Sequence, residues 1–236
     1  MYTINLTSRV KLSLGTSTFF MLLNAAQMET SISKSKCPEC WRSLELCLCR
    51  DIKTQSTKIQ VLILQHPQEA RNPLTTARLA SATLKGSTHR VGLNWRSLSA
   101  ALGHPAESKD WAVLFLGTLK TSKKLPPLPF QVVTQKGAPV SKELIKGIVI
   151  LDGNWKQSKT LWWRNSWLLK LKRIVLNPTI PSDWGTLRKQ PRIECLSTIE
   201  SISFSLAQLN ESPNISKALD TIFKKHVESM TLAKQL

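Results

Sequence analysis

The chain has 236 residues, of which 42% are hydrophobic, and this length and composition fit one compact α/β domain with short appendages. The content of Leu, Ile, Val and Trp argues against a disordered chain. Lys and Arg number 33 against 15 Asp and Glu, which gives a formal net charge of +18. Because a positive field concentrates polyanions near the surface, nucleic acid is the leading partner. The alternative is that the charge is only a trait of the host's whole proteome.

The amino-terminal residues 1–28 contain Arg9 and Lys11 but no acid, and they include one apolar run at 19–23. Residues 1–28 could be a signal peptide or an organellar transit segment. Alternatively, translation could start at Met28. The run is too short to cross a membrane. We expect residues 1–30 to be a disordered leader or a mis-assigned start, because export would place the cysteines that follow in an oxidising compartment. The chain is therefore expected to be cytoplasmic, without membrane contact.

Four cysteines fall within thirteen residues, as a C-x-x-C pair (Cys37 and Cys40) and a C-x-C pair (Cys47 and Cys49). Two tight turns of this kind can bring four thiolates into a tetrahedron, which suits Zn²⁺ best and an Fe–S cluster second. Two disulfides or free thiols are the alternatives. Four thiolate ligands leave no open coordination position, so the pattern predicts a structural zinc knuckle over residues 31–55.

Short apolar runs bounded by polar residues predict buried strands after the cysteine cluster. In chain order they lie at residues 59–64, 90–93, 111–116, 148–151 and 173–176, and the second is weak. Helical patterns lie at residues 75–84, 156–163, 199–209 and 215–230, the last two with apolar residues at three- and four-residue spacing. A proline-rich stretch at 125–129 predicts a rigid connector. Strands that alternate with helices predict an α/β fold, with a mostly parallel sheet and helices on both faces.

Unusual sequences follow several of the predicted strands. They are His66-Pro67, Gly117, residues 152–155 and Asn177-Pro178. Ligands of parallel sheets bind beyond the carboxyl ends of the strands, so these positions predict a site at that edge. The sequence has no internal repeat and no Gly-rich phosphate loop.

A basic stretch from Lys156 to Arg192 carries nine Lys or Arg and one acid, Asp183. Five tryptophans are interleaved with these cations, at positions 155, 162, 163, 167 and 184. Cations could meet phosphates while an exposed Trp stacks on a base. Since Trp is usually well buried, we expect most of the five to belong to the core.

Five sequence blocks, in this order along the chain, resemble the DTW-domain family. They are residues 37–40 with 47–49, 66–69 with 75–79, 114–117, 151–155, and 187–189 with 195–200. The resemblance covers most of the chain, from Cys37 to about Leu209. The fourth block, Leu-Asp-Gly-Asn-Trp, matches the signature that names the family except that Asn154 stands where the family has Thr. Both side chains donate and accept hydrogen bonds, which indicates a subfamily. The sequence also departs from the pattern of the family at Thr75, Ala77 and Leu116.

The resemblance implies a SPOUT-like fold, in which a mostly parallel sheet with helices on both faces is knotted around S-adenosylmethionine, and a DTW catalytic domain over residues 56–236. The implied activity is tRNA-uridine aminocarboxypropyl transfer. A uridine ring nitrogen attacks the methylene carbon next to sulfur, and methylthioadenosine leaves. S-adenosylmethionine is then the co-substrate, zinc is structural and tRNA is the partner, with no obligate protein partner inferred. Three alternatives stay open: an RNA methyltransferase of the same fold class, aminocarboxypropyl transfer to ribosomal RNA, and a non-catalytic zinc-knuckle RNA-binding protein.

Asp152 is the candidate catalytic base, and positioning of the cofactor or capping of the next helix are its alternative roles. Ser197 and Thr198 lead into a helix whose amino terminus could receive the cofactor's carboxylate, whereas Glu200 could merely complete a capping box. The residues expected to bind the cofactor are Leu116, Gly117, Asp152, Asn154, Trp155, Leu196, Ser197, Thr198 and Glu200. The residues expected to contact RNA are His66, Arg78, Arg188 and Lys189. The alternative for His66 is a structural hydrogen bond, and the alternative for the other three is a solvated, charged surface.

Overall fold

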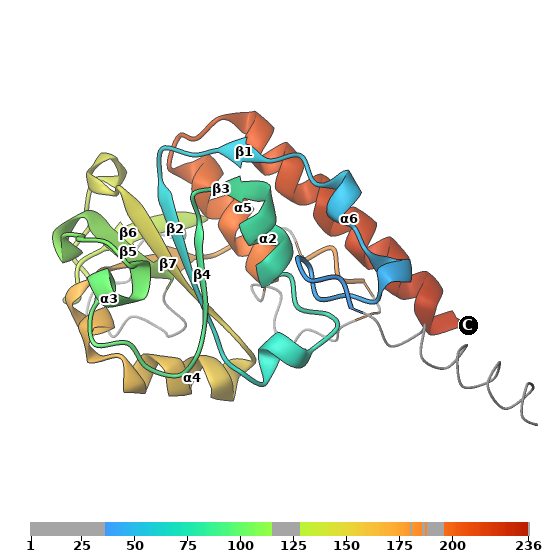
Figure 1. Ribbon diagram of the computed structural model, residues 1–236. Coiled ribbons are helices and arrows are strands. Elements are labelled where there is room, and N and C mark those ends of the chain that lie inside the picture. Colours follow the sequence, from blue (N-terminus) through green and yellow to red (C-terminus); the bar gives the residue numbers. More distant parts are fainter. Residues whose placement is uncertain (1–35, 115–127, 180, 186, 188–195, 236) are drawn as a thin grey trace, which may run out of the picture.

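The computed structural model describes residues 36–114, 128–179, 181–185, 187 and 196–235. Six strands form one sheet in the order β4-β2-β7-β5-β8-β6 (Figure 1). In chain order they are β2 (Gln60–Gln65), β4 (Thr88–Val91), β5 (Trp111–Leu114), β6 (Phe130–Val133), β7 (Gly147–Asp152) and β8 (Lys172–Leu176). Neighbouring strands pair in parallel, except that β6 is antiparallel to β8. A short parallel pair joins β1 (Gln55–Ser56) to β3 (Leu84–Lys85).

The central strands β2 and β7 are covered on both faces of the sheet. Every residue of β7 is buried, and so is every residue of β2 after the first. Their side chains alternate between two apolar clusters: Ile63 and Ile150 belong to one, Leu64 and Leu151 to the other. Burial on both faces explains why these strands have continuous apolar sequences instead of an alternating pattern.

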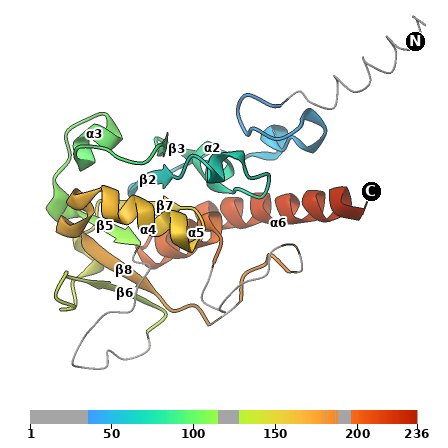
Figure 2. The ribbon, with the colours of Figure 1, turned by 90° about the horizontal axis from the view of Figure 1, so that it is seen from below.

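Helices form a layer on each face of the sheet (Figures 1 and 2). The first cluster receives α2 (Ala77–Thr83), α5 (Thr198–Gln208) and α6 (Pro213–Gln235). The second receives α3 (Leu98–Leu102), α4 (Trp155–Arg164) and the 3₁₀ helix η6 (Ser166–Lys170). The other 3₁₀ turns are η1 (Leu44–Leu46), η2 (Cys49–Asp51), η3 (Glu69–Arg71), η4 (Ser108–Asp110) and η5 (Lys142–Leu144).

The predicted α/β architecture is confirmed, and each predicted helix corresponds to one in the structure. The predicted strands also match, with β4 displaced by two residues and the strand from Trp111 described only as far as Leu114. Strand β6 and helix α3 were not predicted, because their four and five residues are too short to display a period. The SPOUT-like knot stays a prediction, since the connections at 115–127 and 188–195 lie outside the described residues.

The cysteine segment packs onto the sheet domain beside α2 and α6 (Figure 2). Cys37, Cys40 and Leu48 share one buried cluster with Leu79 of α2 and Leu219 of α6. An ion pair between Asp51 and Lys225 of α6 adds a contact at the surface. The predicted boundary between a knuckle and a catalytic domain at residue 55 stays a prediction.

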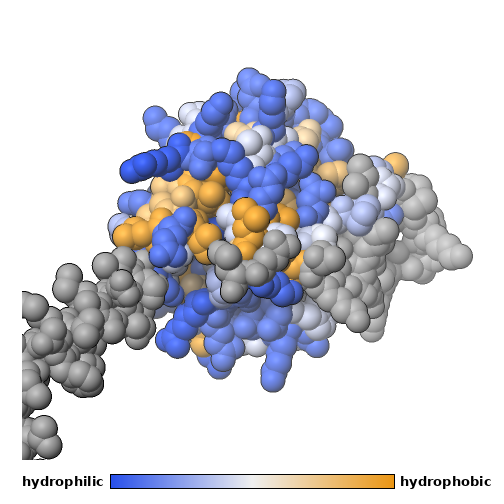
Figure 3. All heavy atoms as spheres, turned by 90° about the vertical axis from the view of Figure 1, so that its right-hand side faces the viewer, coloured by the Kyte–Doolittle hydropathy of each residue, from blue (hydrophilic) through white to orange (hydrophobic). Residues whose placement is uncertain are grey.

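The surface on the side where α6 ends is mostly hydrophilic and encloses a smaller apolar area (Figure 3). Within the described part of the chain, none of the helices combines the length and the apolar character needed to span a lipid bilayer. The predicted leader, residues 1–30, lies outside the described residues.

Candidate active site and metal centre

Asp152, the last residue of β7, lies at the centre of a buried polar cluster at the carboxyl edge of the sheet. Its side chain is only 4% exposed. Gln65 ends the neighbouring strand β2 in register with Asp152 and donates from Nε2 to the carboxylate Oδ2 at 2.7 Å. Thr75 donates to the same oxygen at 3.5 Å, and Thr198, at the start of α5, donates to Oδ1. The carboxylate therefore joins two strand ends to the start of a helix.

His89 on β4 extends this cluster by one hydrogen bond. Its Nε2 lies 3.0 Å from Oε1 of Gln65. Because the Gln65 amide nitrogen donates to Asp152, its oxygen must accept, so His89 carries its proton on Nε2. Burial, with a smaller contribution from the positive charge of Arg78, lowers the pKa of His89 to about 4. Neutral His89 thus orients Gln65, and Gln65 orients Asp152. Sequence reasoning missed both residues; the only signal was a polar Gln at the end of an apolar run.

The amino terminus of α5 is closed by a capping box, as the alternative reading of Glu200 predicted. The Glu200 N–H donates to Ser197 Oγ at 3.2 Å, and the Ser197 N–H donates to Glu200 Oε2 at 2.7 Å. Glu200 also accepts hydrogen bonds from Ser182 and from the N–H of Asp183. The N–H of Ile199, also in the first turn of α5, donates to Thr76 Oγ1 at 3.2 Å. These bonds use the helix terminus to anchor neighbouring segments.

Helix α4 begins three residues after Asp152, and its cap is Asn154. The Asn154 oxygen accepts from the Gln157 N–H at 3.0 Å, while the Gln157 side chain accepts from the Asn154 N–H at 2.7 Å. The suggestion that Asp152 caps this helix is therefore wrong, because its carboxylate faces β2 and α5 instead. Gly153 is required between them, since an added Cβ would lie 2.8 Å from the Gln157 Cβ.

The residues predicted for the RNA side lie in different surroundings. His66 follows β2 directly and is half-buried; burial first, and the charge of Arg164 second, lower its pKa. The Arg78 guanidinium lies over the Trp41 ring of the cysteine segment, with its central carbon 5.3 Å from the ring centroid. Trp167 and Trp184 are buried and Trp162 packs against the core, whereas Trp155 and Trp163 are exposed, so most of the five tryptophans belong to the core, as expected.

Four of the predicted site residues lie outside the described residues, and their roles stay predictions. They are Leu116, Gly117, Arg188 and Lys189. Leu196 is half-buried directly before the α5 cap.

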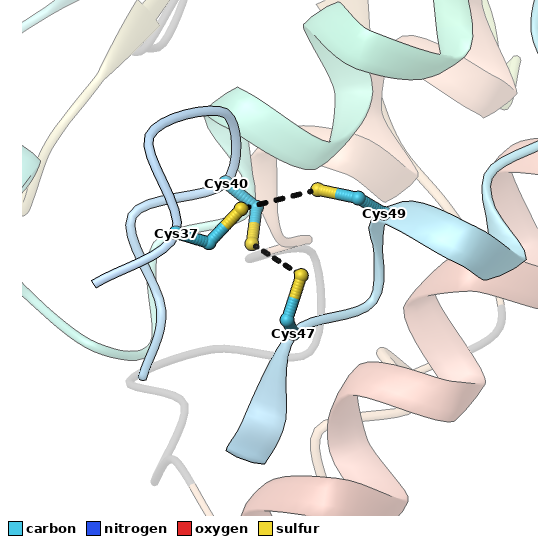
Figure 4. A group of neighbouring side chains, drawn as sticks. All are labelled: Cys37, Cys40, Cys47 and Cys49. Carbon is cyan, nitrogen blue, oxygen red and sulfur yellow. Dashed lines mark hydrogen bonds between the residues drawn. The ribbon is translucent and has the colours of Figure 1, made fainter. Parts of the chain in front are cut away.

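The four clustered cysteines converge on one point (Figure 4). Their sulfur atoms all lie within 4.8 Å of one another, with Cys37 and Cys49 3.6 Å apart and Cys40 and Cys47 3.8 Å apart. A tetrahedron with Zn–S bonds of 2.3 Å has edges of roughly 3.8 Å. A disulfide needs about 2.05 Å, and all four cysteines are free. The arrangement thus fits a tetrahedral metal ion and no disulfide.

Arg42, between the two cysteine pairs, supplies a second observation that fits a metal. It is only 7% exposed, and its two terminal nitrogens have no hydrogen-bond partner among the described residues. Burial lowers its pKa, against the attraction of the neighbouring Cys40, Cys47 and Cys49. A buried unpaired cation is unfavourable. Four thiolates around a dication carry a net charge of −2, and Arg42 would then have a countercharge.

A buried polar cluster at the carboxyl edge of a parallel sheet is where α/β proteins bind their ligands, so the fold and the cluster define a ligand-binding α/β domain with a cysteine module attached. The chain belongs to the DTW domain family. The match to that family covers residues 34–231 and so includes both the cysteine module and the Asp152 cluster.

Curated relatives share about a quarter of their residues with this chain. The tRNA-uridine aminocarboxypropyltransferase 2 of Drosophila melanogaster is 26% identical over 196 residues, which cover 79% of this chain and 71% of the relative. The protein of the same name from Macaca fascicularis is 26% identical over 81% of this chain and 62% of the relative. The tRNA-uridine aminocarboxypropyltransferase A of Arabidopsis thaliana is 24% identical over 81% of this chain and 79% of the relative. No solved structure matches the chain significantly.

Proposed function

We propose that this chain transfers the 3-amino-3-carboxypropyl group of S-adenosylmethionine to a uridine ring nitrogen of tRNA, with release of methylthioadenosine. The observation that carries the proposal is the family match over residues 34–231, together with relatives named tRNA-uridine aminocarboxypropyltransferase. The proposed partner is tRNA, the proposed co-substrate is S-adenosylmethionine, and the proposed compartment is the cytoplasm.

In the proposed reaction a nitrogen–carbon bond forms, the bond from the methylene carbon to sulfur breaks, and the imide proton of uridine leaves. The sulfonium already makes the methylene carbon electrophilic. The tasks of the protein are therefore to orient both substrates, to accept or pass on a proton, and to hold the RNA.

We assign Asp152 a positioning role in this reaction. Both carboxylate oxygens accept hydrogen bonds from the protein, and the side chain is almost fully buried. A group held in this way keeps the ends of β2 and β7 and the start of α5 in one arrangement, beside the edge where the substrates would meet. The role of general base remains the alternative, and the two roles differ in their effect on cofactor affinity.

The remaining site residues are proposals of the same kind. Cofactor contacts are proposed for Leu116, Gly117, Asn154, Trp155, Leu196, Ser197, Thr198 and Glu200, and RNA contacts for His66, Arg78, Arg188 and Lys189. For Ser197 and Glu200 the capping box supports an indirect role, in which they fix the start of α5.

We further propose that Cys37, Cys40, Cys47 and Cys49 hold one structural Zn²⁺. The sulfur geometry supports this assignment, and so does the buried Arg42, whose terminal nitrogens have no partner within the described ranges. A four-thiolate site has no open position for a substrate, so the metal would stabilise the segment without taking part in the transfer.

The proposed transfer can be tested with two radiolabelled forms of S-adenosylmethionine, one labelled in the carboxyl carbon and the other in the methyl carbon. With purified protein and unmodified tRNA, we expect the carboxyl label to enter tRNA and methylthioadenosine to be released. Entry of the methyl label with release of S-adenosylhomocysteine would assign the chain to the RNA methyltransferases. If neither form labels tRNA, the chain would be assigned as an RNA-binding protein without transfer activity.

A further inference from the structure

Helix α4 presents an aromatic and cationic face to solvent. Trp155, Lys159 and Trp163 follow one another at four-residue spacing and so form one row along the helix. Lys156, Thr160 and Arg164 form a parallel row next to it. These six residues, called here the α4 face, line a shallow hollow of about 410 Å³.

The residues of the α4 face do not pack into the apolar core. The opposite side of the helix supplies the packing, through Ser158 and Leu161, both 2% exposed or less. Trp155 and Trp163 are 60% and 73% exposed, although large aromatic side chains gain stability from burial. An exposed Trp in isolation is unremarkable, but two on one row around a lysine form a patch.

The charge of the α4 face is uncompensated in the described structure. The helix contains no Asp or Glu. The ion pairs of the described residues join Lys146 to Asp110 and Lys225 to Asp51, and neither includes a cation of α4. Three cations around two exposed indoles are complementary to a strand with negative phosphates and flat bases.

The position of the α4 face relative to Asp152 is set by the fold. The helix starts three residues beyond Asp152, and Gly153 and the Asn154 cap fix its direction. At 1.5 Å per residue, Trp163 lies roughly 12 Å along the helix from Trp155. An RNA strand bound along the α4 face could span the distance between the two tryptophans. Its next nucleotide could then reach the carboxyl edge of the sheet.

We propose that the α4 face is the docking surface for an unpaired segment of RNA, with Trp163 stacked on a base and Lys159 and Arg164 beside phosphates. The inference rests on the proposed function, because it identifies where the tRNA substrate would lie. A base in a paired stem has no free face, so the segment would be a loop of the tRNA.

The test measures affinity for an unmodified tRNA transcript by fluorescence anisotropy without S-adenosylmethionine, so that its outcome does not depend on any transfer activity. Trp163→Leu keeps apolar bulk but removes the stacking surface, and we expect it to weaken binding roughly 5- to 150-fold. Trp163→Phe keeps an aromatic face and should retain most of the affinity. Both variants should unfold at the wild-type temperature, because the side chain is exposed.

The cationic part is tested by Lys159→Ala against Lys217→Ala, an exposed lysine of α6. Lys159→Ala should reduce the salt dependence of tRNA binding by up to about one unit of slope, and Lys217→Ala should not. Equal tRNA affinity of wild type and Trp163→Leu would overturn the proposal. So would equal losses for Leu and Phe, or binding of vesicles that contain anionic lipid in place of tRNA.

Discussion

Asp152 is the residue on which the candidate active site depends, and its substitution separates the roles considered for it. Gln65 and Thr198 donate to different carboxylate oxygens, so Asp152→Asn must present an NH₂ group to one of two donors. We expect most activity to be lost and the free energy of unfolding to fall by about 1–3 kcal/mol. If Asp152 positions the substrates, S-adenosylmethionine affinity should fall with the rate; if it is the base, affinity should stay within a few-fold. Calorimetric binding beside single-turnover rates decides, and wild-type turnover would exclude both roles.

Two buried histidines make stability depend on pH. The pKa of His89 is lowered to about 4 and that of His226 to about 3, in both cases chiefly by burial, from a usual value of 6.5. Well above pH 6.5 both histidines are neutral in the folded and in the unfolded chain, so neither makes the free energy of unfolding depend on pH. As the pH falls below that value, the unfolded chain binds protons that the folded chain does not, so the free energy of unfolding decreases, by at most about 1.4 kcal/mol per pH unit for each histidine. Urea unfolding at pH 7.5 and 5 should show this loss. His89→Gln should reduce it, and an unchanged pH dependence in that variant would contradict the assignment.

Replacement of Arg42 should have opposite effects on the metal-free protein and on the Zn²⁺-loaded site. Arg42→Met removes a buried cation whose terminal nitrogens have no hydrogen-bond partner in the described part of the chain. The metal-free protein should therefore be as stable as wild type or more so. The Zn²⁺-loaded site should lose the countercharge of its four thiolates and bind the metal more weakly. Chelator competition and thermal unfolding with and without a chelator measure both effects; weaker stability of the metal-free variant would count against the account.

At the scale of elements, the cysteine segment should depend on its metal for its packing against α2 and α6. Cys47→Ser should lower the metal content from about one Zn²⁺ per chain and speed amide exchange over residues 36–51, while strand β7 stays protected. Cys195→Ser is the matched control, because that cysteine lies far from the two cysteine pairs in the sequence, and it should leave the metal content unchanged. Freshly reduced wild-type protein without metal would refute the zinc assignment.

The elements also show how far sequence alone predicts this structure. Strands β2 and β7 were predictable because burial on both faces of the sheet requires a continuous apolar run. The four-cysteine site was predictable because its ligands lie close together in the sequence. The edge strand β6 has only four residues and follows prolines, so no pattern marks it. Gln65 and His89 could not be placed, since their contact depends on the register of β2 with β4, and the Gln65–Asp152 bond joins residues 87 apart in the chain.

At the scale of the whole molecule, the excess of 33 Lys and Arg over 15 Asp and Glu should make tRNA binding long-ranged and salt-sensitive. Free uridine lacks the phosphate backbone that supplies this binding energy, so it should be a poor substrate. Comparison of transfer rates on tRNA and on free uridine checks this expectation. Equal rates would mean that the basic surface has no part in substrate binding.

The proposed transfer can be followed in the cell by mass spectrometry of the nucleosides in tRNA from cells with and without the gene. We expect a uridine that carries an aminocarboxypropyl group in tRNA from cells with the gene and no such nucleoside in tRNA from cells without it. Its return should follow re-expression of the wild-type protein but not of the Asp152→Asn variant. The same level of this nucleoside in both samples, or the loss of a methylated nucleoside in its place, would rule out the proposed transfer.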